Sequence, residues 1–191
     1  SHDTQRILSH IVNKDKYKIR NWGTNFDKFK GSNPNYETRK PNEDEVNKLK
    51  LMLVFQMTYV GAPYIYYGDE VGMWGANDPC PRKPMLWSEF SYDNEKVNPD
   101  QTLRIAQDDN KINSDLLEFY RKLIKIRNDN KVLSDGSFKT ILVDDINNLF
   151  VFEREKDGKQ IIVLLNRSNE TKNIKLSVEH HEFYKDILNK N

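Results

Sequence analysis

The spacing of the apolar residues changes once along the chain, near Gly136. Upstream of it, residues 42–60 and 112–128 carry apolar side chains at helical spacing. Downstream come short runs rich in β-branched and aromatic residues, separated by turn residues; these runs are 138–143, 149–154, 160–165 and 173–178. A chain with this pattern must form helices in its first part and a β-sheet in its second part. The sequence therefore predicts an α/β domain followed by an all-β domain.

We place the predicted domains at residues 1–134 and 135–191. The dipeptide Asp157-Gly158 stands between two of the β-rich runs, and this pair is strongly favoured in two-residue hairpin turns. We therefore expect the second domain to be an antiparallel β-sandwich. We also expect this sandwich to be incomplete at the C-terminal end of the chain.

The first domain contains one clear helix–strand step. Asn42, followed by three acidic residues, has the features of a helix N-cap. The run from Val46 to Met57 is apolar on nearly every face, which predicts a helix buried on more than one side. Residues 64–67 are then typical of a short buried strand. The remaining predicted segments are a short helix over 4–12, a long loop over 16–41 and an irregular excursion over 68–111.

Composition excludes several classes of function. The formal net charge is +1, with charged residues of both signs, so the chain lacks the basic field that a nucleic-acid partner requires. Cys80 is the single cysteine, which rules out an internal disulfide and argues against a cysteine-based metal site. No apolar stretch has the length of a membrane span. We predict no cofactor and no membrane partner, and the sequence leaves a bacterial periplasm and a cytoplasm both open.

Three groups of residues have the types that carry chemistry. The first is His2-Asp3 with Arg6, the second runs from Gly61 to Glu70, and the third from Gly75 to Trp87. Each alone has an ordinary explanation: an aspartate capping a surface helix, a buried strand between turn glycines, and a loop made rigid by prolines. The neighbouring carboxylates Asp69 and Glu70 point to opposite faces of an extended chain, so they cannot flank one bond.

Together and in this order, the three groups resemble the C-terminal half of the alpha-amylase family of glycoside hydrolases. The similarity is greatest to its neopullulanase, cyclomaltodextrinase and maltogenic amylase group. Ser1-His2-Asp3-Thr4-x-Arg6 resembles the last conserved motif of the family. Residues 61–73 resemble the eighth barrel strand with its following turn, and residues 78–87 resemble the next loop. The resemblance implies a C-terminal remnant of a (β/α)8 barrel, from the end of strand seven to helix eight.

The same resemblance implies a retaining hydrolase of starch-derived oligosaccharides, pullulan or cyclodextrins. Such enzymes need a carboxylate nucleophile and a carboxylic acid about 5 Å apart. The family places both in earlier barrel segments, so we expect residues 1–191 alone to be inactive. Asp3 would be the third carboxylate, which stabilises the cationic transition state, and His2 would bind the same sugar. Asp78 and Arg82 either contact more remote sugars or form an ion pair that holds their loop.

Other classes of function remain open at this point. One is a non-catalytic carbohydrate-binding or structural module, and another is a transporter-associated member of the same fold family without hydrolase activity. His2-Asp3 favours an enzyme, because a pure binding module has no need of that carboxylate. The expected partner is an α-glucan oligosaccharide, no metal site is expected, and homo-oligomerisation is left open. We assign Asp69 and Glu70 to loop anchoring.

Overall fold

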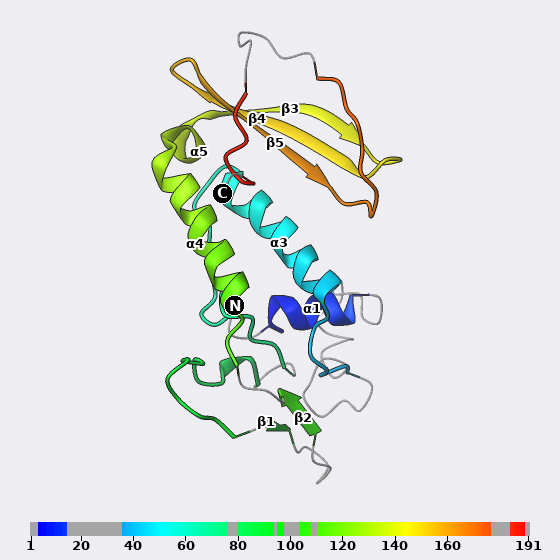
Figure 1. Ribbon diagram of the computed structural model, residues 1–191, viewed down its shortest axis with the longest axis vertical. Coiled ribbons are helices and arrows are strands. Elements are labelled where there is room, and N and C mark those ends of the chain that lie inside the picture. Colours follow the sequence, from blue (N-terminus) through cyan, green and yellow to red (C-terminus); the bar gives the residue numbers. More distant parts are fainter. Residues whose placement is uncertain are drawn as a thin grey trace. The chain divides into compact units, whose positions relative to one another are not determined.

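The computed structural model describes residues 4–14, 36–75, 80–93, 95–97, 104–107, 111–176 and 184–189. The chain divides into two compact units. Unit 1 comprises Ser1–Lys50 and Tyr64–Phe119, and unit 2 comprises Leu51–Pro63 and Tyr120–Asn191. Two long helices, α3 (Glu43–Thr58) and α4 (Ser114–Asp129), each begin in unit 1 and end in unit 2. Figure 1 shows the elements along the chain.

Unit 1 also contains the short helix α1 (Ile7–Asn13), the 3-10 turn η1 (Cys80–Arg82) and the strands β1 (Glu95–Val97) and β2 (Arg104–Gln107). The two strands form an antiparallel pair, which the sequence pattern did not predict. A small apolar core in this unit consists of Val71, Met73 and Leu86.

Helix α3 begins at a reciprocal cap. The backbone N–H of Glu45 donates to Asn42 Oδ1 at 2.9 Å, and the Asn42 N–H donates to Glu45 Oε2 at 2.8 Å. Two of the four N–H groups at a helix start thereby find acceptors. Arg39 also binds both oxygens of Glu45, at 2.8 and 2.6 Å, and this hydrogen bonding lowers the pKa of the Glu45 carboxyl. The N-cap predicted from the sequence is confirmed.

The burial of α3 is narrower than its sequence predicts. Leu49, Leu53 and Met57 form one buried stripe at four-residue spacing, whereas Met52 is 46% exposed and Phe55 is 36% exposed. The prediction that several faces are buried was therefore wrong. An apolar surface is covered only where another element lies against it, and sequence hydrophobicity does not say how many such elements there are.

The strand predicted at 64–67 is also wrong. Residues 62–66 lie in no strand, and a turn begins at Tyr67. A β-strand exists through hydrogen bonds to a neighbouring strand. Within the described part of the chain, no strand pairs with residues 64–67.

Unit 2 contains a three-stranded antiparallel sheet in the order β3 (Ser137–Asp144), β4 (Leu149–Lys156) and β5 (Lys159–Asn166). Figure 1 shows β4 as the central strand. A short helix, α5 (Lys131–Asp135), precedes the sheet and was not predicted. The predicted meander is confirmed for its first three strands. Residues 173–176 of the predicted fourth run lie in no strand, and residues 177–178 lie outside the described residues.

The hairpin between β4 and β5 has the turn that its sequence predicts. Lys156 pairs with Lys159, so two residues form the turn. The two turn residues have positive φ, 52° at Asp157 and 74° at Gly158. Positive φ at both central residues defines the type I′ turn, whose twist matches that of the flanking strands.

Arg154 binds four backbone carbonyl groups of unit 2. Its side chain is fully buried and donates to the carbonyl oxygens of Ser137, Thr58, Leu133 and Gly136, at 3.0, 2.7, 2.9 and 2.9 Å. Thr58 is the last residue of α3, and Leu133 lies in α5. One guanidinium thereby ties the ends of two helices to the start of the sheet.

Arg127 of α4 holds the same end of α3. Its Nη1 donates to the carbonyl oxygens of Met57 at 2.7 Å and Tyr59 at 3.3 Å, and its Nη2 donates to Gly61 O at 2.6 Å. The last carbonyl groups of a helix lack partners inside the helix and carry partial negative charge. Burial lowers the pKa of both arginines, yet the carbonyl oxygens supply the acceptors that the two cations require.

The apolar face of the sheet packs on aromatic rings. Phe152, which is fully buried, lies 5.1 Å from the Phe138 ring and 5.4 Å from the Phe150 ring, centroid to centroid. Phe55, in the unit 2 part of α3, and Tyr59, directly after this helix, contact the same three phenylalanine rings. These contacts hold the C-terminal turns of α3 on the sheet.

We predict that Arg154→Met destabilises the chain by at least about 3 kcal/mol, because four carbonyl groups, two of them in buried hydrogen bonds, lose a charged donor. The free energy of unfolding is measured by urea titration of the full chain, followed by far-UV circular dichroism. Lys125→Met is the control, since it removes an exposed ion pair with Asp129 and costs less than about 0.5 kcal/mol. Equal losses in the two variants would show that Arg154 is not the link between these segments.

Candidate functional site

Three segments of unit 1 meet at the side chain of Arg6. This residue precedes α1, has an extended backbone and is 2% exposed. Its Nη1 donates to Tyr67 O at 2.7 Å and to Asp69 Oδ1 at 3.2 Å, and its Nη2 donates to Pro81 O at 2.8 Å. We refer to Arg6, Tyr66, Tyr67, Asp69 and Pro81 as the Arg6 cluster.

Two aromatic rings complete the surroundings of the guanidinium. The Arg6 Cζ atom lies 5.0 Å from the Tyr66 ring centroid and 5.1 Å from the Tyr67 ring centroid. The negative face of an aromatic ring attracts a cation at this distance, and the planar guanidinium suits such contacts better than an ammonium group does. The other residues of the cluster therefore bind both the charge of the Arg6 guanidinium and its flat faces.

The turn over residues 67–72 has a backbone that requires glycine. Gly68 has φ of 86°, and a Cβ atom there would lie 2.2 Å from Met73 Sδ. Met73 N and Val71 N both donate to Gly68 O, and Gly72 N donates to Asp69 O. This turn points the Tyr67 carbonyl and the Asp69 carboxyl at the same guanidinium.

The carboxyl group of Asp69 has a raised pKa. Burial raises the pKa of its carboxyl to about 6, although the Arg6 charge and hydrogen bond act in the opposite direction. The effect of burial is the larger one, because the ion pair is held by a single 3.2 Å contact. The ion pair fits the anchoring role predicted for Asp69. Among the described residues, Arg6 Nε and Glu70 Oε2 are buried without a hydrogen-bond partner.

Helix α1 is tied to the rest of unit 1 by paired contacts. Ser9 Oγ donates to Gly75 O at 2.8 Å and accepts from Gly75 N at 2.9 Å. Asn13 likewise donates to Glu37 O and accepts from Glu37 N, at 2.9 and 3.0 Å. His10 is partly buried with Nδ1 2.8 Å from Gln5 Nε2, and burial lowers its pKa.

Hydrogen bonds connect the loop after η1 to the turn over residues 67–72 and to Trp74. The Tyr67 hydroxyl donates to Lys83 O at 2.7 Å, and Lys83 Nζ donates to Trp74 O. Trp74 is buried, and its Nε1 donates to Thr38 O at 3.3 Å. The Trp74 ring is therefore packed inside unit 1, whereas Trp87 is 53% exposed.

The structure describes one of the four residues predicted to contact substrate. Arg82 is exposed at the end of η1. His2, Asp3 and Asp78 lie outside the described residues, so their roles remain predictions. The structure does bring together residues next to them in the chain, because Arg6 follows Asp3 by three positions and Pro81 directly precedes Arg82. The sequence motif includes Arg6, but nothing local indicates what its side chain binds.

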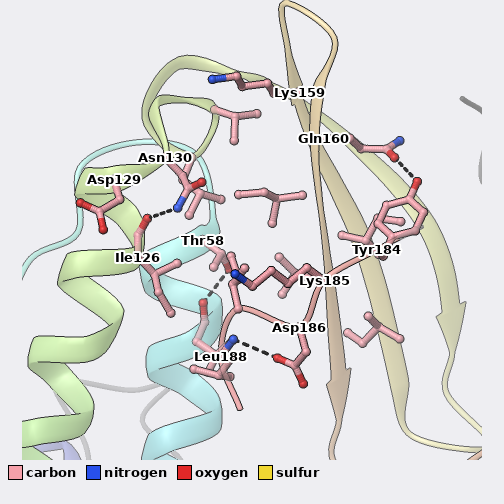
Figure 2. A pocket seen from close by; sticks show the side chains of 18 of the residues that line it. Thr58, Ile126, Asp129, Asn130, Lys159, Gln160, Tyr184, Lys185, Asp186 and Leu188 are labelled. Atoms are coloured by element: carbon pink, nitrogen blue, oxygen red, sulfur yellow. Dashed lines mark hydrogen bonds between the residues drawn. The ribbon is translucent and has the colours of Figure 1, made fainter. Parts of the chain in front are cut away.

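A hollow of about 1,380 Å³ lies within unit 2. Figure 2 shows Tyr184 at its edge, with the hydroxyl hydrogen-bonded to Gln160. Aliphatic side chains such as Leu123, Ile161 and Val163 form much of the wall, and among the described lining residues Tyr184 is the one aromatic. Aliphatic walls suit the interior of a β domain and offer sugar rings little surface for stacking.

The described residues contain no helix that combines the length and apolarity of a membrane span. They also contain no group of three or more His, Cys, Asp or Glu side chains arranged to hold a metal ion.

Comparison with known proteins identifies two family models along the chain. The model described as alpha amylase, catalytic domain, matches residues 32–136, which is more than half of the chain. The model described as alpha amylase, C-terminal all-beta domain, matches residues 141–191. The predicted fold class, part of a catalytic α/β domain followed by an all-β domain, is confirmed by these matches, as is the resemblance seen in the motifs.

Individual relatives agree. The cyclomaltodextrinase of Thermoanaerobacter pseudethanolicus is 44% identical over 144 residues, which cover 75% of this chain and 21% of that protein. Neopullulanase 2 of Thermoactinomyces vulgaris is 36% identical over 131 residues, covering 69% of this chain and 19% of that protein. A solved cyclomaltodextrinase structure covers 94% of this chain and 22% of its own, with a TM-score of 0.60 and 28% identity. The chain thus spans about a fifth of the length of these relatives.

We predict that the Asp69 carboxyl titrates near pH 6 in the full chain, measured by NMR from its ¹³Cγ shift. A carboxyl whose pKa is raised on folding binds its proton more tightly in the folded state. Its contribution to stability is therefore fully present at low pH and is lost as the pH rises through about 6. Asp69→Asn cannot titrate and lacks this contribution.

The free energy of unfolding of the wild type, minus that of Asp69→Asn, should therefore fall between pH 4 and pH 7. Urea titrations of both proteins at several pH values measure this difference. A difference that stays constant over the range would contradict the raised pKa.

Proposed function

Because this chain belongs to the alpha-amylase family, we propose that the whole protein of which it forms part is a retaining glycoside hydrolase acting on α-glucans. The substrates we propose are starch-derived oligosaccharides, pullulan or cyclodextrins. The names of the relatives, cyclomaltodextrinase and neopullulanase, support this class of substrate.

The observation that carries the proposal is the anchoring of the motif by Arg6. Ser1-His2-Asp3-Thr4-x-Arg6 resembles a catalytic motif of the family, and its Arg6 is held by the Tyr67–Gly72 turn and the η1 loop. A motif kept only as a helix start would need no buried guanidinium. The anchoring supports an origin of this segment at the rim of a sugar-cleaving site.

We assign Asp3 the role of transition-state stabiliser. Cleavage by a retaining glycosidase builds positive charge on the sugar ring. A carboxylate that hydrogen-bonds the hydroxyl groups of that sugar favours the charged, distorted ring over the ground state. His2 donates a hydrogen bond to the same sugar, and Asp78 and Arg82 contact sugars farther along the chain of the substrate. The nucleophile and the acid come from other segments of the whole protein.

We predict that Asp3→Asn lowers kcat of the whole protein on maltooligosaccharides about 10²- to 10³-fold, because the neutral amide stabilises the developing cation poorly. The melting temperature should remain close to that of the wild type. Asp44→Asn, at an exposed position in the first turn of α3, is the control and should keep kcat within about twofold. Near-normal turnover by Asp3→Asn would remove Asp3 from the mechanism.

Residues 1–191 by themselves should release no reducing sugar from maltooligosaccharides. The reaction requires two carboxyl groups facing each other across the scissile bond, and we assign neither to this chain. A reducing-sugar assay of the purified chain, beside the whole protein at equal molar concentration, measures this. Turnover by the chain alone would place the nucleophile and the acid within residues 1–191.

A further inference from the structure

We propose that Arg6 is a positioning residue of the active site: it fixes the start of α1, three residues after Asp3 in the chain, relative to η1, whose last residue is Arg82. The inference rests on the proposed function, and it adds a residue that contacts no substrate. Arg6 acts through the backbone of the two segments.

The two sides of the guanidinium serve different segments. Nη1 binds the turn, through Tyr67 O at 2.7 Å and Asp69 Oδ1 at 3.2 Å. Nη2 binds the η1 loop, through Pro81 O at 2.8 Å. A guanidinium presents donors in a rigid planar fork, so the positions of its three acceptors are fixed relative to one another. A lysine ammonium keeps the charge but has no such fork.

Arg6 lies close enough in the chain to control the proposed site residues. Three residues of extended chain span at most about 11 Å, which limits how far Asp3 can lie from Arg6. Pro81 directly precedes Arg82, so the carbonyl that Arg6 holds belongs to the peptide bond leading into Arg82. Displacement of a catalytic group by about 1 Å can cost on the order of 10²-fold in rate.

The loop has a second and separable anchor. The Tyr67 hydroxyl donates to Lys83 O at 2.7 Å, two residues beyond the carbonyl that Arg6 holds. Tyr67 is 39% exposed, and Tyr67→Phe keeps the ring that lies against Arg6. This change therefore loosens the loop and leaves the attachment of Arg6 to the turn intact.

The competing explanation is that Arg6 only stabilises the fold. Arg127 provides the matched control, because it is also buried and also donates to backbone carbonyl oxygens, but in unit 2. Arg127→Lys and Arg6→Lys make the same chemical change at two buried arginines. If stability alone mattered, both would lower the melting temperature and neither would change kinetics below it.

The experiment compares steady-state kinetics of the whole protein on maltooligosaccharides, well below the melting temperature of every variant. Arg6→Lys should lower kcat about 10- to 100-fold, because the chain leading to Asp3 loses its attachment at Arg6. Tyr67→Phe should raise KM about three- to tenfold with kcat nearly unchanged, because only the loop is loosened. Arg127→Lys should keep both constants within about twofold.

Hydrogen exchange gives a readout that does not depend on turnover. Arg6→Lys should speed amide exchange in both residues 4–10 and residues 80–85, whereas Arg127→Lys should affect neither segment. Wild-type kinetics in Arg6→Lys, or the same kinetic loss in Arg127→Lys, would overturn the inference. If the whole protein hydrolyses no α-glucan, the proposed function fails. Unchanged exchange in Arg6→Lys would instead refute the anchoring alone.

Discussion

In each of the two units, buried arginine side chains donate to backbone carbonyl oxygens and thereby hold segments of that unit together. Arg6 does so in unit 1, and Arg127 and Arg154 do so in unit 2. An unpaired carbonyl buried away from water costs free energy comparable to a lost hydrogen bond. The ends of helices and the segments between strands have many such carbonyls, and a guanidinium can serve several of them at once.

The reliance on carbonyl acceptors has an electrostatic consequence. A buried cation is costly unless it finds compensating negative charge, and the end of α3 supplies partial negative charge without a carboxylate. Arg127 and Arg154 both use this end, which explains how two buried arginines lie in one small unit. Arg6 differs, since it adds the carboxylate of Asp69 to its two carbonyl oxygens.

Features that depend on neighbouring residues could be predicted from the sequence. The cap of α3 needs only Asn42 and Glu45, and the β4–β5 turn needs only Asp157 and Gly158. Residues 64–67 have the composition of a strand, but a strand also requires a partner that local sequence cannot specify. The same limit explains why β1 and β2 and the exposed face of α3 were not predicted.

In the candidate site, too, the motifs could be predicted from the sequence and the long-range contacts could not. The order of three motifs was enough to predict the family, which the comparisons confirm. The contacts of Arg6 join residues 61, 63 and 75 positions apart, and such pairs leave no trace in the local pattern of a single sequence. Arg6 was visible as a member of the motif, and its partners became visible only in the folded chain.

An anchor that binds main-chain atoms leaves the side chains of the held segments available for other work. Pro81 has no N–H group, so its carbonyl is the one hydrogen-bonding group of its backbone, and Arg6 binds it. The proline ring fixes φ, which stiffens the peptide leading into Arg82. Arg82 meanwhile remains exposed at the end of η1. A loop held in this way keeps its path when its side chains change.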